Sequence, residues 1–330
     1  MRTRVMPLKP AIALAAVAAL TLSACGGGGS EATEPTEKTP VTVKAGFIPV
    51  IDVAALYLGQ EKGFFSDRGI NLKISTGQGG AALVPPVVSG EYQFAFSNMV
   101  SILTARDKGL PLKIVAAGSS STAVEGKDVT MIHAAKGSGI TSAEQLAGKK
   151  VAVNTVGNLM ELLGSVGVDA AGGDSSKVNF VELGFPEALA AMKAGEIDAM
   201  VGAEPFDTTA SAEGHEVISS PYLSMSKTSM LTSAYFTSES QLKKNPKLFE
   251  AIRGAIDESL AYAQEHPDEV RTQVSKFTDI DKGLLDKITL PSFYPEIPKE
   301  SIELFDEYAT KYKILDKSVS YDDVVWRGEQ

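Results

Sequence analysis

The sequence is poor in the side chains that most redox, metal and nucleophilic chemistry requires. Cysteine occurs once in 330 residues, as Cys25, and histidine three times, as His133, His215 and His266. A single cysteine excludes an internal disulfide and any metal cluster built from cysteines. The histidines are scattered, and no paired-carboxylate or Gly-x-Ser-x-Gly motif accompanies them. We therefore expect a protein that is not an enzyme and that needs no cofactor or metal ion.

Positive charge is also scarce. The 31 Lys and Arg residues are outnumbered by 41 Asp and Glu residues, which gives a formal net charge of −10 at pH 7. Nucleic-acid binding depends on a basic face, so this balance argues against a nucleic-acid partner. No arginine lies between Arg106 and Arg253, so this long segment offers no guanidinium fork to a carboxylate or sulfonate. Helix N-termini and neutral donors would have to hold an anionic ligand there.

The N-terminus has the features of a lipoprotein export signal. Three basic residues within the first nine positions precede an apolar or small run at 11–22. This run is too short for a membrane-spanning helix, which needs about 20 residues. Small residues then stand directly before Cys25. We expect residues 1–24 to be removed and Cys25 to carry a lipid; the alternative is an ordinary secretory signal with a chance cysteine.

The segment 25–40 follows, with four consecutive glycines and then mainly Ser, Glu, Thr and Pro residues. Such a composition buries little apolar surface, so we expect a flexible tether. The lipid on Cys25 would hold the protein on the extracytoplasmic side of the cell membrane.

From residue 41 the pattern alternates short apolar runs with longer amphipathic segments, which predicts an α/β fold. The predicted strands are 41–47, 72–74, 92–96, 112–117, 129–133, 151–153, 178–182 and 197–201. The strand 129–133 begins a second α/β series. Beyond 236 the pattern changes to long amphipathic helices, of which 246–266 is the clearest. We expect these helices to pack back on the first series rather than to form a third domain.

Several short motifs are similar to those of a known family. They are Gly-Phe-Ile-Pro at 46–49, the helix 56–65 with its Gly-Phe-Phe end, Gly-Ile-Asn-Leu at 69–72, and the Gly-Glu pairs that begin 90–95 and 195–199. With these motifs the chain resembles the ABC-importer binding proteins for aliphatic sulfonates, taurine, nitrate and thiamine-pyrimidine precursors. The similarity covers nearly all of residues 41–315.

The resemblance implies a type II periplasmic-binding-protein-like clamshell, an α/β fold of two lobes, each a mixed sheet flanked by helices, with the ligand cleft between them. Lobe 1 would comprise 41–130 and 235–330, and lobe 2 would comprise 131–234. A monomer would deliver a small polar or anionic organic solute, such as a sulfonate, taurine or a carboxylate, to an ABC permease and its ATPase. Two alternatives stay open: a thiamine-pyrimidine precursor as ligand, or a sensory or surface lipoprotein without a transport role.

Ligands of open α/β sheets bind where the carboxyl ends of strands lead into loops and helix N-termini, so we expect the site in those loops. The glycine loop near 79 would let the backbone approach a ligand, although a simple turn would need glycine too. Glu204 would accept hydrogen bonds from an amine or hydroxyl, unless it is a solvated loop acid. Helix capping and core packing are the competing roles of the polar and aromatic candidates. The predicted ligand-binding residues are Pro49, Asp52, Gln78, Gly79, Gly80, Ala81, Ser97, Asn98, Asn154, Thr155, Asn158, Glu204, Phe206 and Tyr235.

Overall fold

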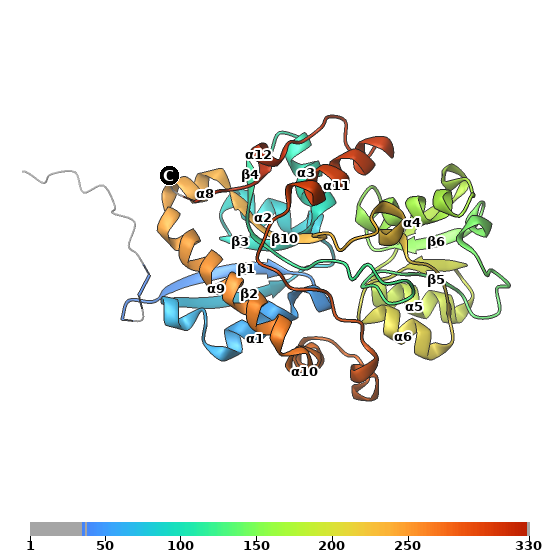
Figure 1. The fold of residues 1–330 in the computed structure, drawn as a ribbon, viewed down its shortest axis with the longest axis horizontal. Helices are drawn as coiled ribbons and strands as arrows, with labels where there is room; N and C mark the ends of the chain where they lie inside the picture. Colours follow the sequence, from blue (N-terminus) through green and yellow to red (C-terminus); the bar gives the residue numbers. More distant parts are fainter. Residues whose placement is uncertain (1–34, 37, 329–330) are drawn as a thin grey trace, which may run out of the picture. The chain divides into compact units, whose positions relative to one another are not determined.

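Two five-stranded sheets organise the computed structural model, which describes residues 35–36 and 38–328. Figure 1 shows the first sheet among blue, cyan and orange elements and the second among green and yellow ones. Both sheets belong to one compact unit, Glu34–Gln330. The predicted signal peptide (1–24), the predicted lipidation site Cys25 and most of the predicted tether (25–40) lie outside the described residues. In the described part of the chain, no helix has the length and apolarity needed to cross a membrane.

The first sheet has the strand order β2-β1-β3-β10-β4. Its strands are β1 (Val41–Phe47), β2 (Ile70–Thr76), β3 (Phe94–Asn98), β4 (Leu112–Ala117) and β10 (Ser233–Ser238). β1 is parallel to β2 and β3, whereas β10 enters antiparallel between β3 and β4. Every residue of β10 is buried. The last strand in the sequence therefore completes the interior of the first sheet.

The second sheet repeats this plan with the order β7-β6-β8-β5-β9. Its strands are β5 (Ile132–Ala134), β6 (Lys150–Val153), β7 (Asn179–Glu182), β8 (Ala199–Val201) and β9 (Glu216–Ser219). β6 is parallel to β7 and β8, whereas β5 is antiparallel to β8 and β9. In each sheet, a strand that runs antiparallel to its neighbours therefore begins at the end of the sheet where those neighbours finish. We refer to the first sheet with its helices as lobe 1 and to the second as lobe 2.

Helices flank both sheets. Those interleaved with the strands are α1 (Ala54–Lys62), α2 (Val84–Ser89) and α3 (Met99–Asp107) in lobe 1, and α4 (Leu159–Ala170), α5 (Phe185–Ala194), α6 (Phe206–Glu213) and α7 (Pro221–Met225) in lobe 2. After β10 come α8 (Glu239–Lys244), α9 (Pro246–Glu265), α10 (Pro267–Phe277), α11 (Lys299–Lys311) and α12 (Tyr321–Val324). The long α9 packs against α1 and β4. The C-terminal helices thus add to lobe 1.

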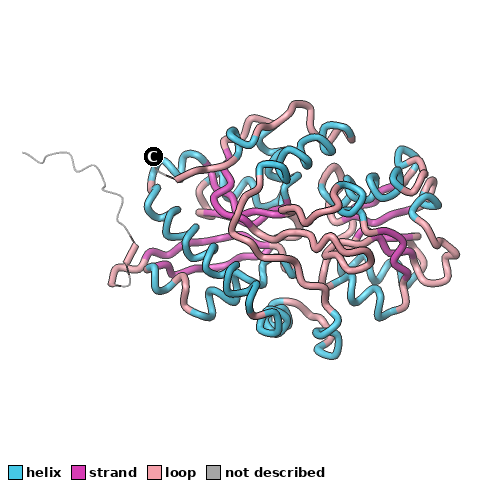
Figure 2. The backbone as a smooth tube through the Cα atoms, viewed as in Figure 1, coloured by secondary structure: helices cyan, strands magenta, loops and turns pink. Residues whose placement is uncertain are grey.

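Irregular segments run between the two sheets, as the loops in the middle of Figure 2 show. The chain crosses from lobe 1 to lobe 2 at 118–131 and returns at 226–232. A third segment, 288–292, lies beside these crossings, because Ser120 forms isolated bridges with both Leu231 and Ser292. Three segments that are far apart in the sequence therefore meet between the lobes.

Two predicted strands have shifted ends for identifiable reasons. The predicted strand 92–96 lies at Phe94–Asn98, since Gln93 accepts the Lys44 N–H with its side-chain oxygen, at 2.7 Å, rather than with its main-chain carbonyl. The predicted strand 129–133 begins only at Ile132, because the Met131 N–H donates to a carboxylate. The strand β9 was not expected, since its first two residues are exposed and provide no apolar run.

Helices α1 and α9 approach closely at Gly59. A Cβ at this position would lie 1.8 Å from Oγ of Ser259 and 2.6 Å from its Cβ. Contacts this short place the packing cost of Gly59→Ala at about 3 kcal/mol, whereas the gain in helix propensity is about 1 kcal/mol. The free energy of unfolding should therefore fall by about 2 kcal/mol. Denaturant unfolding measures the loss, and Ser259→Gly in the same chain should restore much of it. A Gly59→Ala variant as stable as the parent would contradict this close packing.

Candidate functional site

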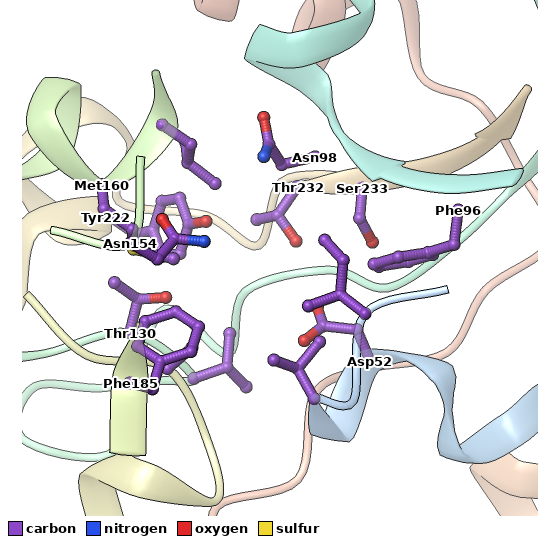
Figure 3. Close-up of a pocket in the computed structure, with 15 residues that line it drawn as sticks. Asp52, Phe96, Asn98, Thr130, Asn154, Met160, Phe185, Tyr222, Thr232 and Ser233 are labelled. Carbon is purple, nitrogen blue, oxygen red and sulfur yellow. The ribbon is translucent and has the colours of Figure 1, made fainter. Parts of the chain in front are cut away.

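A cavity lies where the strand ends of the two lobes face each other (Figure 3). Its volume is about 40 Å³, whereas a single water needs roughly 10–15 Å³ on this scale. The lining residues are Ile48, Val50, Asp52, Phe96, Asn98, Val129, Thr130, Asn154, Leu159, Met160, Phe185, Ala203, Tyr222, Thr232 and Ser233. The cavity therefore has room for a small polar group with a few heavy atoms.

Asp52 supplies the carboxylate of this cavity. After β1 the chain turns into the short 3-10 helix Ile51–Val53, which carries Asp52. The carboxylate accepts a hydrogen bond from Ser119 Oγ, which in turn lies 2.9 Å from Ser233 Oγ. Burial raises the pKa of Asp52, the serine hydrogen bond opposes this rise, and the negative charge of Asp128 adds to it. Lobe 1 thus presents a partly desolvated acceptor to the cavity.

Two asparagines face the cavity from opposite lobes. Asn98 ends β3 and caps α3, where its Oδ1 accepts the Ser101 N–H at 2.9 Å. The same residue lines the cavity, so capping and site placement coincide at this position. Asn154 follows β6 directly, and Figure 3 shows its amide directed toward the space between the lobes. Each amide offers donors and an acceptor to a bound solute.

Tyr222 lies on α7 of lobe 2, next to Thr130 and Thr232 of the two crossing segments. The tyrosine is 3 % exposed, and burial holds the pKa of its hydroxyl well above the usual range, while hydrogen bonding to Thr130 and Thr232 opposes this rise. Phe96 of lobe 1 and Phe185 of lobe 2 add aromatic surface. The cavity therefore combines a few polar groups with apolar walls, which is typical of small-molecule sites.

The glycine loop lies against protein atoms. A Cβ on Gly79 would lie 2.7 Å from Thr155 Oγ1 of lobe 2, and a Cβ on Gly80 would lie 1.9 Å from Ser97 Oγ. Ser97 is fully buried, and its hydroxyl has no hydrogen-bond partner among the described residues. The loop thus faces 154–155 of lobe 2, but Gly79, Gly80, Ser97 and Thr155 are outside the cavity lining.

Three further predicted ligand-binding residues have other surroundings. Gln78 and Ala81 are exposed. Asn158 caps α4 by accepting the Leu159 N–H at 2.8 Å, and its Oδ1 also accepts Ser101 Oγ–H at 3.0 Å. This last contact joins the starts of α3 and α4 across the two lobes.

Pro49 and the two predicted aromatic residues, Phe206 and Tyr235, lie outside the cavity lining. Pro49 and Phe206 line a separate pocket near Phe277. Tyr235 is fully buried within lobe 1, with its ring centroid 5.5 to 6.1 Å from the rings of Phe96, Phe47 and Phe94. It packs in the core because β10 is an interior strand of the sheet. Tyr57, on α1, stacks on Phe277 at a centroid distance of 4.5 Å.

Glu204 lies outside the Asp52 cavity lining. Its carboxylate accepts Thr208 Oγ1–H at 2.9 Å, Thr208 N–H at 3.2 Å and Thr289 N–H at 3.0 Å. The residue is 2 % exposed and lines a different cavity of about 750 Å³, together with Asp207 and His133. Burial and the nearby Asp207 charge raise the pKa of Glu204 to about 8. The carboxylate thus holds the segment 288–292 against lobe 2.

Sequence reasoning did not propose several of the lining residues. Thr130, Thr232 and Ser233 lie at the starts of the antiparallel strands β5 and β10 or just before them. Their position in the crossing segments could have indicated them. A strand that runs antiparallel to its neighbours begins at the end of the sheet where those neighbours finish, and the cavity lies at that end. Tyr222 and Phe185 gave no comparable signal, because both lie on helices whose position depends on tertiary packing.

The described residues contain no group of three or more His, Cys, Asp or Glu side chains arranged to hold a metal ion. Of the neighbouring ionisable residues Glu204, Asp207 and His133, the last two are hydrogen-bonded to each other, whereas Glu204 accepts hydrogen bonds from Thr208 and Thr289.

Two mixed sheets, each with an antiparallel strand next to parallel ones, and a small cavity between their strand ends define a periplasmic-binding-protein-like fold. The predicted fold class is thereby confirmed. Residues 50–270 match the model of the NMT1/THI5-like family, and the chain belongs to that family. A search of curated protein sequences found no match.

Solved structures with the same fold include three binding proteins. The periplasmic aliphatic sulphonate binding protein SsuA from Escherichia coli has a TM-score of 0.71 and 17 % identity, over 88 % of this chain and 98 % of its own. The alkanesulfonate-binding protein SsuA from Xanthomonas axonopodis pv. citri, bound to MOPS, has a TM-score of 0.74 and 15 % identity, over 87 % of this chain and 99 % of its own. The periplasmic nitrate-binding protein NrtA from Synechocystis has a TM-score of 0.69 and 16 % identity, over 86 % of this chain and 84 % of its own. At these identities the likeness establishes the fold alone.

Proposed function

We propose that the protein is an extracytoplasmic solute-binding protein, anchored to the cell membrane through a lipid on Cys25. It captures a small polar solute between lobe 1 (41–130 and 235–330) and lobe 2 (131–234). As a monomer it then delivers the solute to an ABC permease and its ATPase. It catalyses no reaction.

The observation that carries this proposal is the composition of the cavity wall. Asp52, Phe96 and Asn98 come from lobe 1, whereas Asn154 and Phe185 come from lobe 2. A solute in contact with both walls would favour the arrangement in which the lobes lie close together. Such a coupling between binding and lobe closure is what a transporter can recognise.

Contacts between the lobes support a closure that a solute can tune. Ser101 Oγ–H donates to Asn158, and the Ile51 N–H donates to the main-chain oxygen of Glu204 at 3.0 Å. Each of these hydrogen bonds is worth about 1 kcal/mol, as is the one from the Tyr312 hydroxyl to Asp169 across the same two lobes. A solute that adds several contacts of this size would shift the balance further toward closure. Family membership and the three periplasmic binding proteins of the same fold agree with this role.

The test is a thermal-shift screen of the full-length protein, purified in a mild detergent. The panel contains sulfonates, taurine, nitrate, aromatic and aliphatic carboxylates, pyrimidines and amines. A solute present at 100 times its dissociation constant should stabilise the protein by about 2.7 kcal/mol. Isothermal titration should then give one site per chain. If no solute class shifts the melting temperature, the proposal of a solute-binding function is wrong.

A further inference from the structure

The cavity of Figure 3, here called the Asp52 cavity, has an acidic lining for which the fold alone gives no reason. Among the described residues that line it, Asp52 is the one carboxylate, and none is Lys, Arg or His. Its side-chain hydrogen-bond donor is the neutral hydroxyl of Ser119. Among the described residues, the charge that acts on Asp52 most strongly is the second carboxylate, Asp128, which raises its pKa further. The cavity therefore contains a carboxyl group, and no cation among the described lining residues balances its charge when it ionises.

Taking a carboxylate out of water costs free energy unless a partner compensates. Asp52 is fixed in place by the Ser119–Ser233 hydroxyl pair, and these hydroxyls stay neutral at every ordinary pH. An anionic group entering the same small space would meet Coulomb repulsion in a medium of low dielectric constant. A cationic group would instead supply the missing partner.

The other walls suit the carbon skeleton of such a solute. Phe96, Phe185 and Tyr222 line the cavity, and aromatic faces attract cations through their electron-rich rings. Asn98 and Asn154 stand apart from Asp52 in Figure 3, so their amide donors can take a neutral or acidic end of the same solute. A zwitterion is therefore compatible with the cavity, whereas an anion without a cationic group is not.

We propose that the solute carries a protonated amine or an equivalent cationic nitrogen, and that Asp52 is the residue that binds this charge. The inference rests on the proposed solute-binding function and names the chemical class of the ligand. It assigns the amine to Asp52, whereas the sequence analysis had assigned this role to Glu204.

The experiment uses matched probes that differ in the amine. Ethanolamine, taurine and ethanesulfonate share a two-carbon chain, and benzylamine and benzoate share an aromatic ring. Thermal shift and isothermal titration are run on the full-length protein and on Asp52→Asn. We expect stabilisation by amine-bearing probes, and an affinity for them at least about thirtyfold weaker in Asp52→Asn, which keeps the acceptor for Ser119 but lacks the charge.

Two controls separate a binding role from a folding role. Asp128→Asn removes one charge from a buried carboxylate outside the cavity lining, and it should weaken binding far less than Asp52→Asn. The melting temperature of unliganded Asp52→Asn should be no lower than that of the parent, because burial disfavours the charged form of Asp52.

The outcomes are distinct. Stabilisation by ethanesulfonate or benzoate that persists in Asp52→Asn overturns the inference and leaves the solute-binding function intact. Amine binding that is equally strong in Asp52→Asn also overturns it. Silence from these probes and from the wider panel overturns both the inference and the proposed function.

Discussion

Replacing Asp207 with alanine should lower the free energy of unfolding by about 3–5 kcal/mol. The carboxylate is 3 % exposed, its Oδ1 lies 2.9 Å from Nε2 of the fully buried His133, and its Oδ2 accepts the Met131 N–H at 3.1 Å. Burial raises the pKa of Asp207, and the interaction with His133 opposes this rise. Alanine would leave the imidazole and a main-chain N–H without partners at the start of lobe 2.

Denaturant unfolding followed by circular dichroism measures this loss. The matched control is Glu303→Ala, which removes an acid from an exposed ion pair with Lys299 on α11 and should change stability little. Asp207→Asn retains an oxygen acceptor and should fall between the two. If Asp207→Ala is no less stable than Glu303→Ala, the pair with His133 does not anchor lobe 2.

The unfolding free energy of the parent protein should fall as the pH rises from about 4.5 to about 8, because of Glu204. In the unfolded chain this carboxyl loses its proton near pH 4.5, whereas in the folded protein it keeps the proton up to about pH 8. The folded state thus binds more protons across this window, so each rise in pH favours unfolding. The contribution is on the order of 5 kcal/mol when the window is crossed completely.

Glu204→Gln should remove most of this slope. Glutamine keeps an oxygen that can accept the Thr289 and Thr208 donors, yet it carries no charge to desolvate. We therefore expect the variant to be more stable than the parent at pH 8 and nearly equal to it at pH 4.5. Urea unfolding at five or six pH values gives both curves.

Several other ionisable residues surround Glu204 and will also respond to pH. Asp207, Asp128 and His133 lie on neighbouring elements, and Arg271, Asp286 and Lys287 line the same cavity, so some pH dependence will remain in the variant. Glu250→Gln, on the exposed face of α9, should leave the parental slope unchanged. Equal slopes for the parent and Glu204→Gln would mean that this carboxyl is ionised in the folded protein.

The alternation of apolar runs and amphipathic segments was enough to predict the α/β fold, because buried strands and flanking helices leave different periodicities. The rule that ligands bind beyond strand ends predicted three residues that line the cavity, Asp52, Asn98 and Asn154, since each follows or ends a parallel strand. Whether they bind a solute stays a prediction.

The same rule could not resolve neighbouring positions. Tyr235 lies two residues beyond Ser233, the lining residue of β10, so the alternation along a strand puts both side chains on the same face. Tyr235 is farther from the end of the strand, however, and its ring packs among Phe47, Phe94 and Phe96 in the core. Glu204 follows β8, yet its carboxylate turns toward Thr208 and Thr289. The register of one strand and the path of a distant segment decide these directions, and neither can be read locally.

The sequence by itself determined the fold class, the resemblance to importer binding proteins and the strand ends that meet at the cavity, since these depend on local patterns. The sequence also predicts an export signal and a lipid on Cys25. The tertiary structure alone decided that β10 inserts between β3 and β4 and that Tyr222 and Thr130 complete the cavity wall. It also decided that Asp52 meets no Lys, Arg or His among the described residues that line the cavity. These features depend on contacts between residues far apart in the chain, which no local pattern encodes.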